Sequence, residues 1–292
     1  MNSIIKVLQI VLVAVILVSC GSGKGTKETP SVEEVQEAKT IHDIDQLLKD
    51  IPPPSLIPFN LKGINAEFNR EIINDLTNIE KYKGDMDKMA LNMGTYASDV
   101  SYLAAYGHED DCIEYLKACH QLAEMMGDSI IYDDEHISSF RGHVQTGNKE
   151  EISKLIGTLF LNTSVQMEKD HHLTMAGLAL TGSFIEELYQ AVITIENFPQ
   201  TKQNQKLLEP LAKIVLEHEK ALRDIIAVLN DLPYDDTIST ITAEMGILDA
   251  LYKGDLQKIE DQMKADPNFV ITKDHLRNIA YEVKRIREDI VK

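Results

Sequence analysis

The sequence LTMAGLALTGSFI at residues 173–185 decides the fold, because none of its thirteen residues is charged. A second stretch, MALNMGTYAS at residues 89–98, is uncharged over ten residues. A helix that is apolar on every side is buried on every side, and both stretches are too short to span a membrane. Small residues recur in both and let neighbouring helices approach closely. We therefore expect central helices over residues 89–106 and 173–196.

The sequence around these stretches also has the helical period. From Leu61 onward apolar residues recur about every 3.6 residues, and no segment alternates as a strand would. Hydrophobic residues make up 43% of the chain and charged residues 26%, which is typical of a globular protein. The pattern predicts an all-α fold, a compact multi-helix bundle over residues 39–292. Its last helix carries one apolar stripe: Leu276, Ile279, Val283, Ile286 and Ile290.

Residues 85–169 and 171–265 share landmarks in the same order. Each has a small residue followed by serine on its uncharged helix, then Tyr-Asp-Asp, then a glycine that opens a further helix. The matching segments are Ala97-Ser98 and Gly182-Ser183, Tyr132-Asp133-Asp134 and Tyr234-Asp235-Asp236, and Gly147-Asn148 and Gly254-Asp255. This order favours an internal duplication of a helical unit. The alternative is chance similarity among helical sequences.

The N-terminus has the organisation of a secretory signal peptide. Lys6 precedes a stretch at residues 7–18 that is apolar apart from Gln9. That length suits a signal peptide and is short for a membrane span. We expect residues 1–19 to be the signal peptide; an uncleaved helix is the alternative.

The signal peptide ends in Leu17-Val18-Ser19-Cys20, which resembles the bacterial lipobox. The resemblance implies cleavage before Cys20, a diacylglycerol on its thiol and a further acyl chain, such as palmitate, on its new amino group. More than one acyl chain gives durable membrane anchoring. Residues 20–38 would then be the lipidated cysteine and a flexible tether, rich in Gly, Ser, Thr and charge.

The charge balance excludes some partners. The chain has 29 Lys and Arg against 47 Asp and Glu, a formal net charge of −18. Such a surface repels phosphate backbones, so we expect no nucleic-acid partner. The sequence also lacks the linear motifs of hydrolases, metalloproteases and dinucleotide-binding enzymes, which predicts a protein without catalytic activity or cofactor.

The candidate binding residues lie on the two central helices. Tyr96, Asp99 and Tyr102 are on the first, and Glu186 and Tyr189 are on the second. Burying a carboxylate without a partner costs several kcal/mol or raises its pKa, so the fold must satisfy these groups or expose them in a cleft. We expect a closed centre, because uncharged helices rich in small residues pack closely.

One pair has the spacing of metal ligands. Glu168 and His171 form a Glu-x-x-His sequence, half of a ferritin-like di-metal site. The full site needs a second Glu-x-x-His and two further glutamates, and no second copy occurs. These residues are therefore weak metal candidates, and we expect them to precede and begin the second central helix.

Several segments resemble an uncharacterised family of all-helical lipoproteins from Bacteroidota. They are Ile51-Pro52-Pro53-Pro54, the run from Ala90 to Tyr96 with Asp99 and Tyr102, and the run from Gly182 to Tyr189. The sequence departs from the family at Phe184, where a tryptophan is expected. The resemblance implies a fold and a compartment but no activity. Residues 21–27 contain no acidic run of the kind that accompanies surface export, which favours the outer membrane facing the periplasm.

Together these features predict a membrane-anchored helical lipoprotein with a binding or assembly role in the cell envelope. Its partners would be the membrane, through the lipid anchor, and an envelope protein. Two alternatives stay open. One is a small-molecule or metal-binding lipoprotein with a pocket between the two helical halves; the other is an enzyme without a recognisable linear motif.

Overall fold

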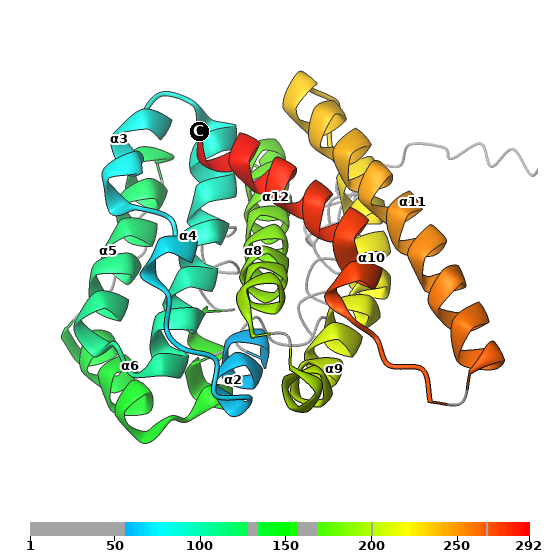
Figure 1. The fold of residues 1–292 in the computed structure, drawn as a ribbon. Coiled ribbons are helices and arrows are strands. Elements are labelled where there is room, and N and C mark those ends of the chain that lie inside the picture. Colours follow the sequence, from blue (N-terminus) through cyan, green and yellow to red (C-terminus); the bar gives the residue numbers. More distant parts are fainter. Residues whose placement is uncertain (1–55, 128–133, 153, 157–168, 200, 267) are drawn as a thin grey trace, which may run out of the picture.

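The computed structural model describes residues 56–127, 134–152, 154–156, 169–199, 201–266 and 268–292. Within these ranges the chain forms packed helices and no strand, as Figure 1 shows, so the prediction of an all-α bundle is confirmed. The predicted signal peptide, Cys20, the tether and Glu168 lie outside the described residues.

The helices follow one another along the chain with short connections. The α-helices are α2 (Leu56–Gly63), α3 (Ile79–Tyr82), α4 (Met86–Tyr106), α5 (Glu109–Met125), α6 (Asp134–Thr146), α8 (Lys169–Asn197), α9 (Lys202–Glu217), α10 (Glu219–Asp231), α11 (Asp236–Ala265) and α12 (Arg277–Val291). Three short 3₁₀ helices are η1 (Arg70–Ile72), η2 (Leu76–Asn78) and η3 (Lys273–Leu276).

Helix α4 begins and ends at residues that its local sequence specifies. The carboxylate of Asp85 caps its first turn by accepting a hydrogen bond from the Lys88 backbone N–H. Gly107 ends the helix in the left-handed conformation, with φ 78°, and its N–H bonds the last turn.

Helices α4 and α8 form the centre of the bundle, as the uncharged stretches predict. Every residue from 89 to 105 of α4 is buried, and so is every residue from 173 to 188 of α8. Gly94 of α4 packs against Ala179 of α8, and Asp99 further along α4 bonds Gln190 further along α8. The two helices therefore run in the same direction.

Two glycines allow this close approach. A Cβ on Gly94 would lie 1.8 Å from the carbonyl oxygen of Ala179, and one on Gly182 would lie 1.9 Å from that of Leu91. Each glycine thus faces the carbonyl three residues before the other glycine. This reciprocal contact pairs Gly94 with Gly182. The sequence landmarks matched Gly182 with Ala97 instead, which lies about one helical turn after Gly94.

The remaining helices enclose this pair. Helices α5 and α6 cover one side, α10 and α11 the other, and α12 crosses α8 so that its C-terminal end lies beside the start of α4 (Figure 1). The predicted stripe of α12, from Leu276 to Ile290, is buried. None of the described helices combines the length and the apolar character needed to cross a bilayer.

Candidate functional site

Asp99 lies in a closed part of the core. Its side chain is fully buried, with Oδ2 accepting a hydrogen bond from the Asn74 backbone N–H at 2.9 Å and Oδ1 accepting one from Gln190 Nε2 at 3.0 Å. Burial, and secondarily the charge of Glu186, raise the pKa of Asp99 well above its ordinary value. Burial therefore favours the neutral form of this carboxyl group.

The tyrosines of α4 bond to the loop before α3 and not to Asp99. The hydroxyl of Tyr96 donates to the Asp75 carbonyl at 2.9 Å, and that of Tyr102 accepts from the Asn69 N–H at 3.0 Å. Both phenols thus hold residues 69–75 against α4, and this segment supplies Asn74 to Asp99. The phenols position the loop, and the loop in turn binds the carboxyl group.

Glu186 and Tyr189 meet a residue of the last helix. Arg287 of α12 donates two hydrogen bonds to the Glu186 carboxylate, at 3.0 and 3.2 Å, and its Cζ lies 4.5 Å from the centre of the Tyr189 ring. Burial raises the pKa of Glu186, while the charge and hydrogen bonds of Arg287 oppose that rise. The pair is therefore a buried, bidentate ion pair that joins α8 to α12.

A second carboxyl group on α8, that of Glu187, follows Glu186 in the sequence and is also buried. Glu187 is almost fully buried, and its Oε1 has no hydrogen-bond partner among the described residues. Burial raises its pKa well above the ordinary value. The centre thus contains three buried carboxyl groups, Asp99, Glu186 and Glu187, of which one has a bidentate arginine partner.

The same centre fixes the end of the chain. Asn92 Nδ2 donates to the Ile290 carbonyl at 2.8 Å, and the Tyr82 hydroxyl donates to the Val291 carbonyl at 3.1 Å. The last carbonyls of a helix have no partner within the helix, so these side chains cap α12. They tie the C-terminal helix to α3 and α4.

The five predicted binding residues are therefore placed together in the core, but they bond to protein groups. None of them lines the cavities that open between α4, α11 and α12, at the end of α8, or beside Arg70. Their partners Asn74, Gln190 and Arg287 were missing from the prediction. One signal was present: Arg287 falls on the apolar stripe of α12, between Val283 and Ile290.

The raised pKa of Asp99 predicts that the stability of the fold depends on pH. A carboxyl group whose pKa is raised by folding stabilises the fold below its ordinary pKa of about 4, and that contribution is lost as the pH rises toward the folded value. We expect Asp99→Asn to make this loss of stability with rising pH shallower. The asparagine retains an acceptor for Asn74, and its amide can donate to Gln190 Oε1 once the Gln190 amide turns over, because Gln190 now presents its Nε2 to this position.

Urea unfolding between pH 4 and 9 measures this effect. Glu187 leaves a residual slope, so the decline should weaken without vanishing. Asp261→Asn, at an exposed position of α11, is the matched control and should leave the slope unchanged. An equal slope in wild type and Asp99→Asn would mean that Asp99 is ionised in the fold.

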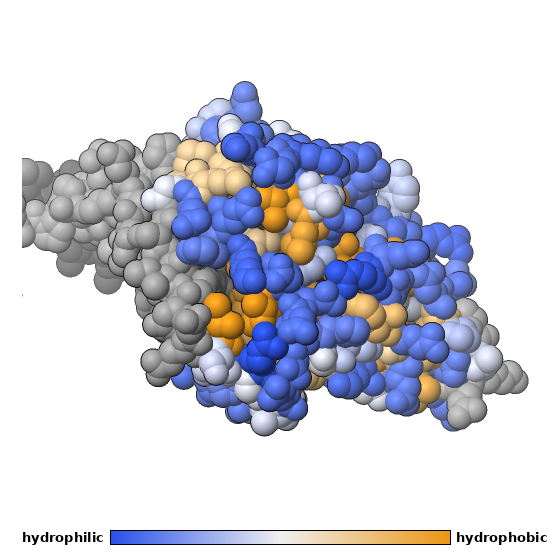
Figure 2. All heavy atoms as spheres, turned by 90° about the vertical axis from the view of Figure 1, so that its left-hand side faces the viewer, coloured by the Kyte–Doolittle hydropathy of each residue, from blue (hydrophilic) through white to orange (hydrophobic). Residues whose placement is uncertain are grey.

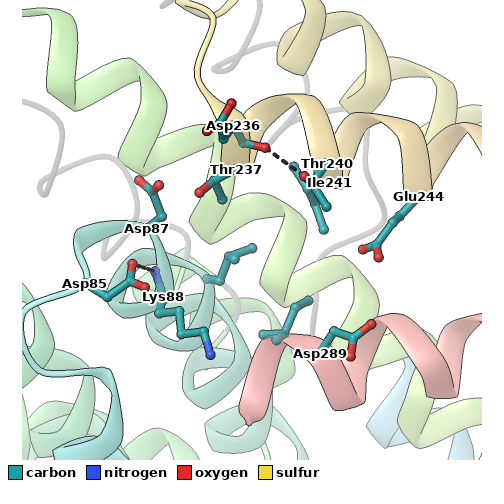
Figure 3. Close-up of a pocket in the computed structure, with 11 residues that line it drawn as sticks. Asp85, Asp87, Lys88, Asp236, Thr237, Thr240, Ile241, Glu244 and Asp289 are labelled. Carbon is teal, nitrogen blue, oxygen red and sulfur yellow. Dashed lines mark hydrogen bonds between the residues drawn. The ribbon is translucent and has the colours of Figure 1, made fainter.

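A cavity of about 370 Å³ lies where α4 and α11 begin and α12 ends. Figure 3 shows Asp85 and Lys88 of α4 across from Asp236 and Glu244 of α11, with Asp289 on α12. The lining also includes the carboxylate of Asp87 and three apolar side chains: Leu91, Ile241 and Ile290. The pocket therefore has five carboxylates and one ammonium group around an apolar surface.

Two of the five carboxylates in this pocket are explained by their positions at the N-terminal ends of helices. Asp85 caps α4, and Asp236 is in the first turn of α11, so both complement the positive end of a helix. Arg285 neutralises two others, donating to Glu244 at 2.9 Å and to Asp289 at 3.1 Å. The carboxylates are spread around the pocket, and no three His, Cys, Asp or Glu among the described residues are placed to share a metal ion.

Of the two metal candidates, the structure describes His171 only. Glu168 is outside the described residues, and His171 is in the first turn of α8, where the structure describes the backbone alone. The sequence expectation that this segment leads into the buried helix agrees with the bounds of α8.

The outer surface is hydrophilic where Figure 2 shows it, on the side of α3, α5 and α6. Hydrophobic residues on this face form small separate patches among hydrophilic ones. Large hydrophobic side chains are exposed on other helices, among them Ile247 and Met263 on α11 and Tyr281 on α12.

Comparison with known proteins assigns no family to this chain. No protein-family model matches the sequence, and neither a curated protein nor a solved structure is significantly similar to it. The fold and the site define the class directly: an all-helical bundle with a buried polar centre and an acidic surface pocket.

Proposed function

We propose that this chain is a lipid-anchored protein of the cell envelope, held at the outer membrane facing the periplasm, with a binding or assembly role. The observation that supports a binding role on the outer surface is the closed centre, because Asp99 and Glu186 are bonded to other protein groups. The lipobox-like sequence before Cys20 supplies the anchor.

The anchor has a direct test. Cys20→Ala should abolish acylation and leave precursor or released soluble protein, because the thiol that receives the lipid is gone. Fractionation without detergent and mass spectrometry of the N-terminus measure this, with Ser22→Ala as the control that stays acylated. Full membrane association of Cys20→Ala would reject the lipid anchor.

The binding role predicts a partner that contacts exposed apolar side chains. Ile247 and Tyr281 are 52% and 67% exposed on helices α11 and α12, which pack against each other, and we choose them as the positions to probe. A photo-reactive residue at 247 or 281 should cross-link an envelope protein in intact cells, whereas one at Lys117 of α5, on the other flank, should not. Cross-linking that is absent from both positions, or equal at all three, would reject this surface.

A second candidate function is supported by the acidic pocket. It lies between α4 in the first half of the proposed duplication and α11 in the second, which is where the small-molecule alternative places a pocket. An apolar surface ringed by carboxylates suits an ammonium group on a short aliphatic chain. A linear diamine should bind, with affinity falling as salt rises.

Calorimetric titration with the diamine cadaverine tests this second function. Asp236→Asn should weaken binding, and Asp261→Asn, exposed near the other end of α11, should not. Absence of binding, or equal loss in both variants, would remove the small-molecule function while leaving the anchored, protein-binding role intact.

A further inference from the structure

A second cavity, of about 510 Å³, lies at the C-terminal end of α8. Three segments form it: residues 65–72, which follow α2 and include η1, residues 193–199 at the end of α8, and Asn204 on α9. It is distinct from the acidic pocket, and it meets the polar centre at Asn69, whose backbone N–H bonds the Tyr102 hydroxyl. Its size is within the range of cavities that hold small ligands.

The polar lining consists mainly of amides. Four asparagines contribute: Asn65, Asn69, Asn197 and Asn204. Within the described part of the chain, the side chains of Asn65 and Asn197 make no hydrogen bond. Asn69 uses its Oδ1 to accept from the Glu71 N–H at 3.0 Å, which leaves its NH₂ group available.

The charges of this cavity exclude anionic ligands. Glu67 is the one charged residue in the lining, and no lysine, arginine or histidine is part of it. The end of α8 also presents carbonyl groups, which carry the negative end of the helix dipole. Phosphate and carboxylate ligands need cationic or N–H-rich surroundings, and these are lacking here.

Apolar groups complete the lining. Phe68 and Phe198 are both half-buried against the core. The ring of Phe68 is held in place by Tyr102 and His108, whose ring centres lie 5.5 and 4.0 Å away. The cavity therefore combines fixed aromatic carbon with asparagine amides in its lining, of which Asn204 donates its NH₂ group to the Pro199 carbonyl at 2.8 Å.

We propose that this cavity binds a neutral, hydroxyl-rich ligand, namely one or two pyranose sugar units. A hydroxyl group is both donor and acceptor, and an amide side chain offers both a donor and an acceptor to it. The C–H faces of a pyranose match the aromatic and aliphatic lining. A peptide fits less well, because peptides bind along strand edges or extended grooves, whereas three separate segments line this one cavity.

Titration of the full mature chain with cellobiose tests the proposal. Saturable binding should be seen by calorimetry at concentrations up to about 10 mM, which corresponds to a weak but specific affinity. Backbone amide signals of Ile193, Thr194 and Asn204 should shift on binding. Cellobiose should bind more tightly than its uronic-acid analogue or trialanine.

Asn197→Leu is the diagnostic variant, because it replaces an exposed amide by an apolar group of similar size. It should weaken cellobiose binding about tenfold, the effect of one lost hydrogen bond, without lowering the melting temperature. Asn230→Leu, at an exposed amide of α10 outside the cavity, should bind normally.

Three results would overturn the proposal: no saturable binding, equal binding by Asn197→Leu and wild type, or tighter binding of trialanine or the uronic acid. The sugar could be the end of a polysaccharide or a free saccharide, and sedimentation with insoluble envelope polysaccharide distinguishes the two. Cosedimentation that cellobiose abolishes assigns the site to a polymer end, and soluble binding alone assigns it to free saccharides.

Discussion

Gly94→Ala is expected to destabilise the bundle by about 3 kcal/mol or more, the upper end of the cost of overpacking a core. The added methyl group would lie 1.8 Å from the Ala179 carbonyl oxygen and 2.8 Å from the Ser183 backbone nitrogen. Both are main-chain atoms in a buried helix, so relief requires α4 and α8 to separate. Gly182→Ala should behave alike, because its methyl would lie 1.9 Å from the Leu91 oxygen.

Urea unfolding followed by circular dichroism measures the loss. The matched control is Gly246→Ala on α11, where a methyl group would meet nothing within 4 Å. That change should be neutral or should stabilise the protein by about 0.5–1 kcal/mol, since alanine favours a helix over glycine. If Gly94→Ala unfolds within 1 kcal/mol of wild type, the close contact of α4 and α8 is wrong.

Arg287→Met is expected to cost about 3–5 kcal/mol, because it leaves the Glu186 carboxylate buried without its partner. Glu186 is fully buried, and the Arg287 side chain is 14% exposed. The matched control is Lys284→Met on the same helix. Its ion pair with Glu196 is about one-third exposed on both sides, and such pairs contribute about 1 kcal/mol or less.

The dependence on pH separates lost charge compensation from lost packing. Without Arg287 the pKa of Glu186 rises further, so the variant binds a proton on Glu186 when folded and regains stability as the pH falls. The deficit should therefore be largest at neutral pH and should shrink toward pH 4. Adding Glu186→Gln should restore part of the stability at neutral pH. A deficit that is independent of pH in both backgrounds would contradict a charge-based role.

The local sequence determined the architecture to a large extent. The uncharged residues 89–98 and 173–185 predicted which helices are central, because a helix without charged side chains can be buried on every side at little desolvation cost. The stripe from Leu276 to Ile290 predicted the buried face of α12, since helical spacing alone places those residues together. The cap at Asp85 and the glycine at 107 mark helix ends through interactions within a few residues.

The roles of the candidate residues were decided by the tertiary structure. Tyr96, Asp99, Tyr102, Glu186 and Tyr189 were expected near a buried centre, and they are there or at its edge. Whether each would meet a ligand or a protein group depended on residues far along the chain. Arg287 is 101 positions from Glu186, and Asn74 reaches Asp99 from a loop. Periodicity describes one helix at a time and carries no information about such partners.

Both cavities likewise depended on how distant segments meet. The acidic pocket needs the ends of α4, α11 and α12, and the amide-lined cavity needs a loop, the end of α8 and the side of α9. Each segment by itself has ordinary helix caps and polar surface residues. What the sequence determined was the burial of its uncharged helices, because hydrophobic patterning is local. The pairing of charges and the shape of the surface arose only from packing, because they depend on the relative placement of helices.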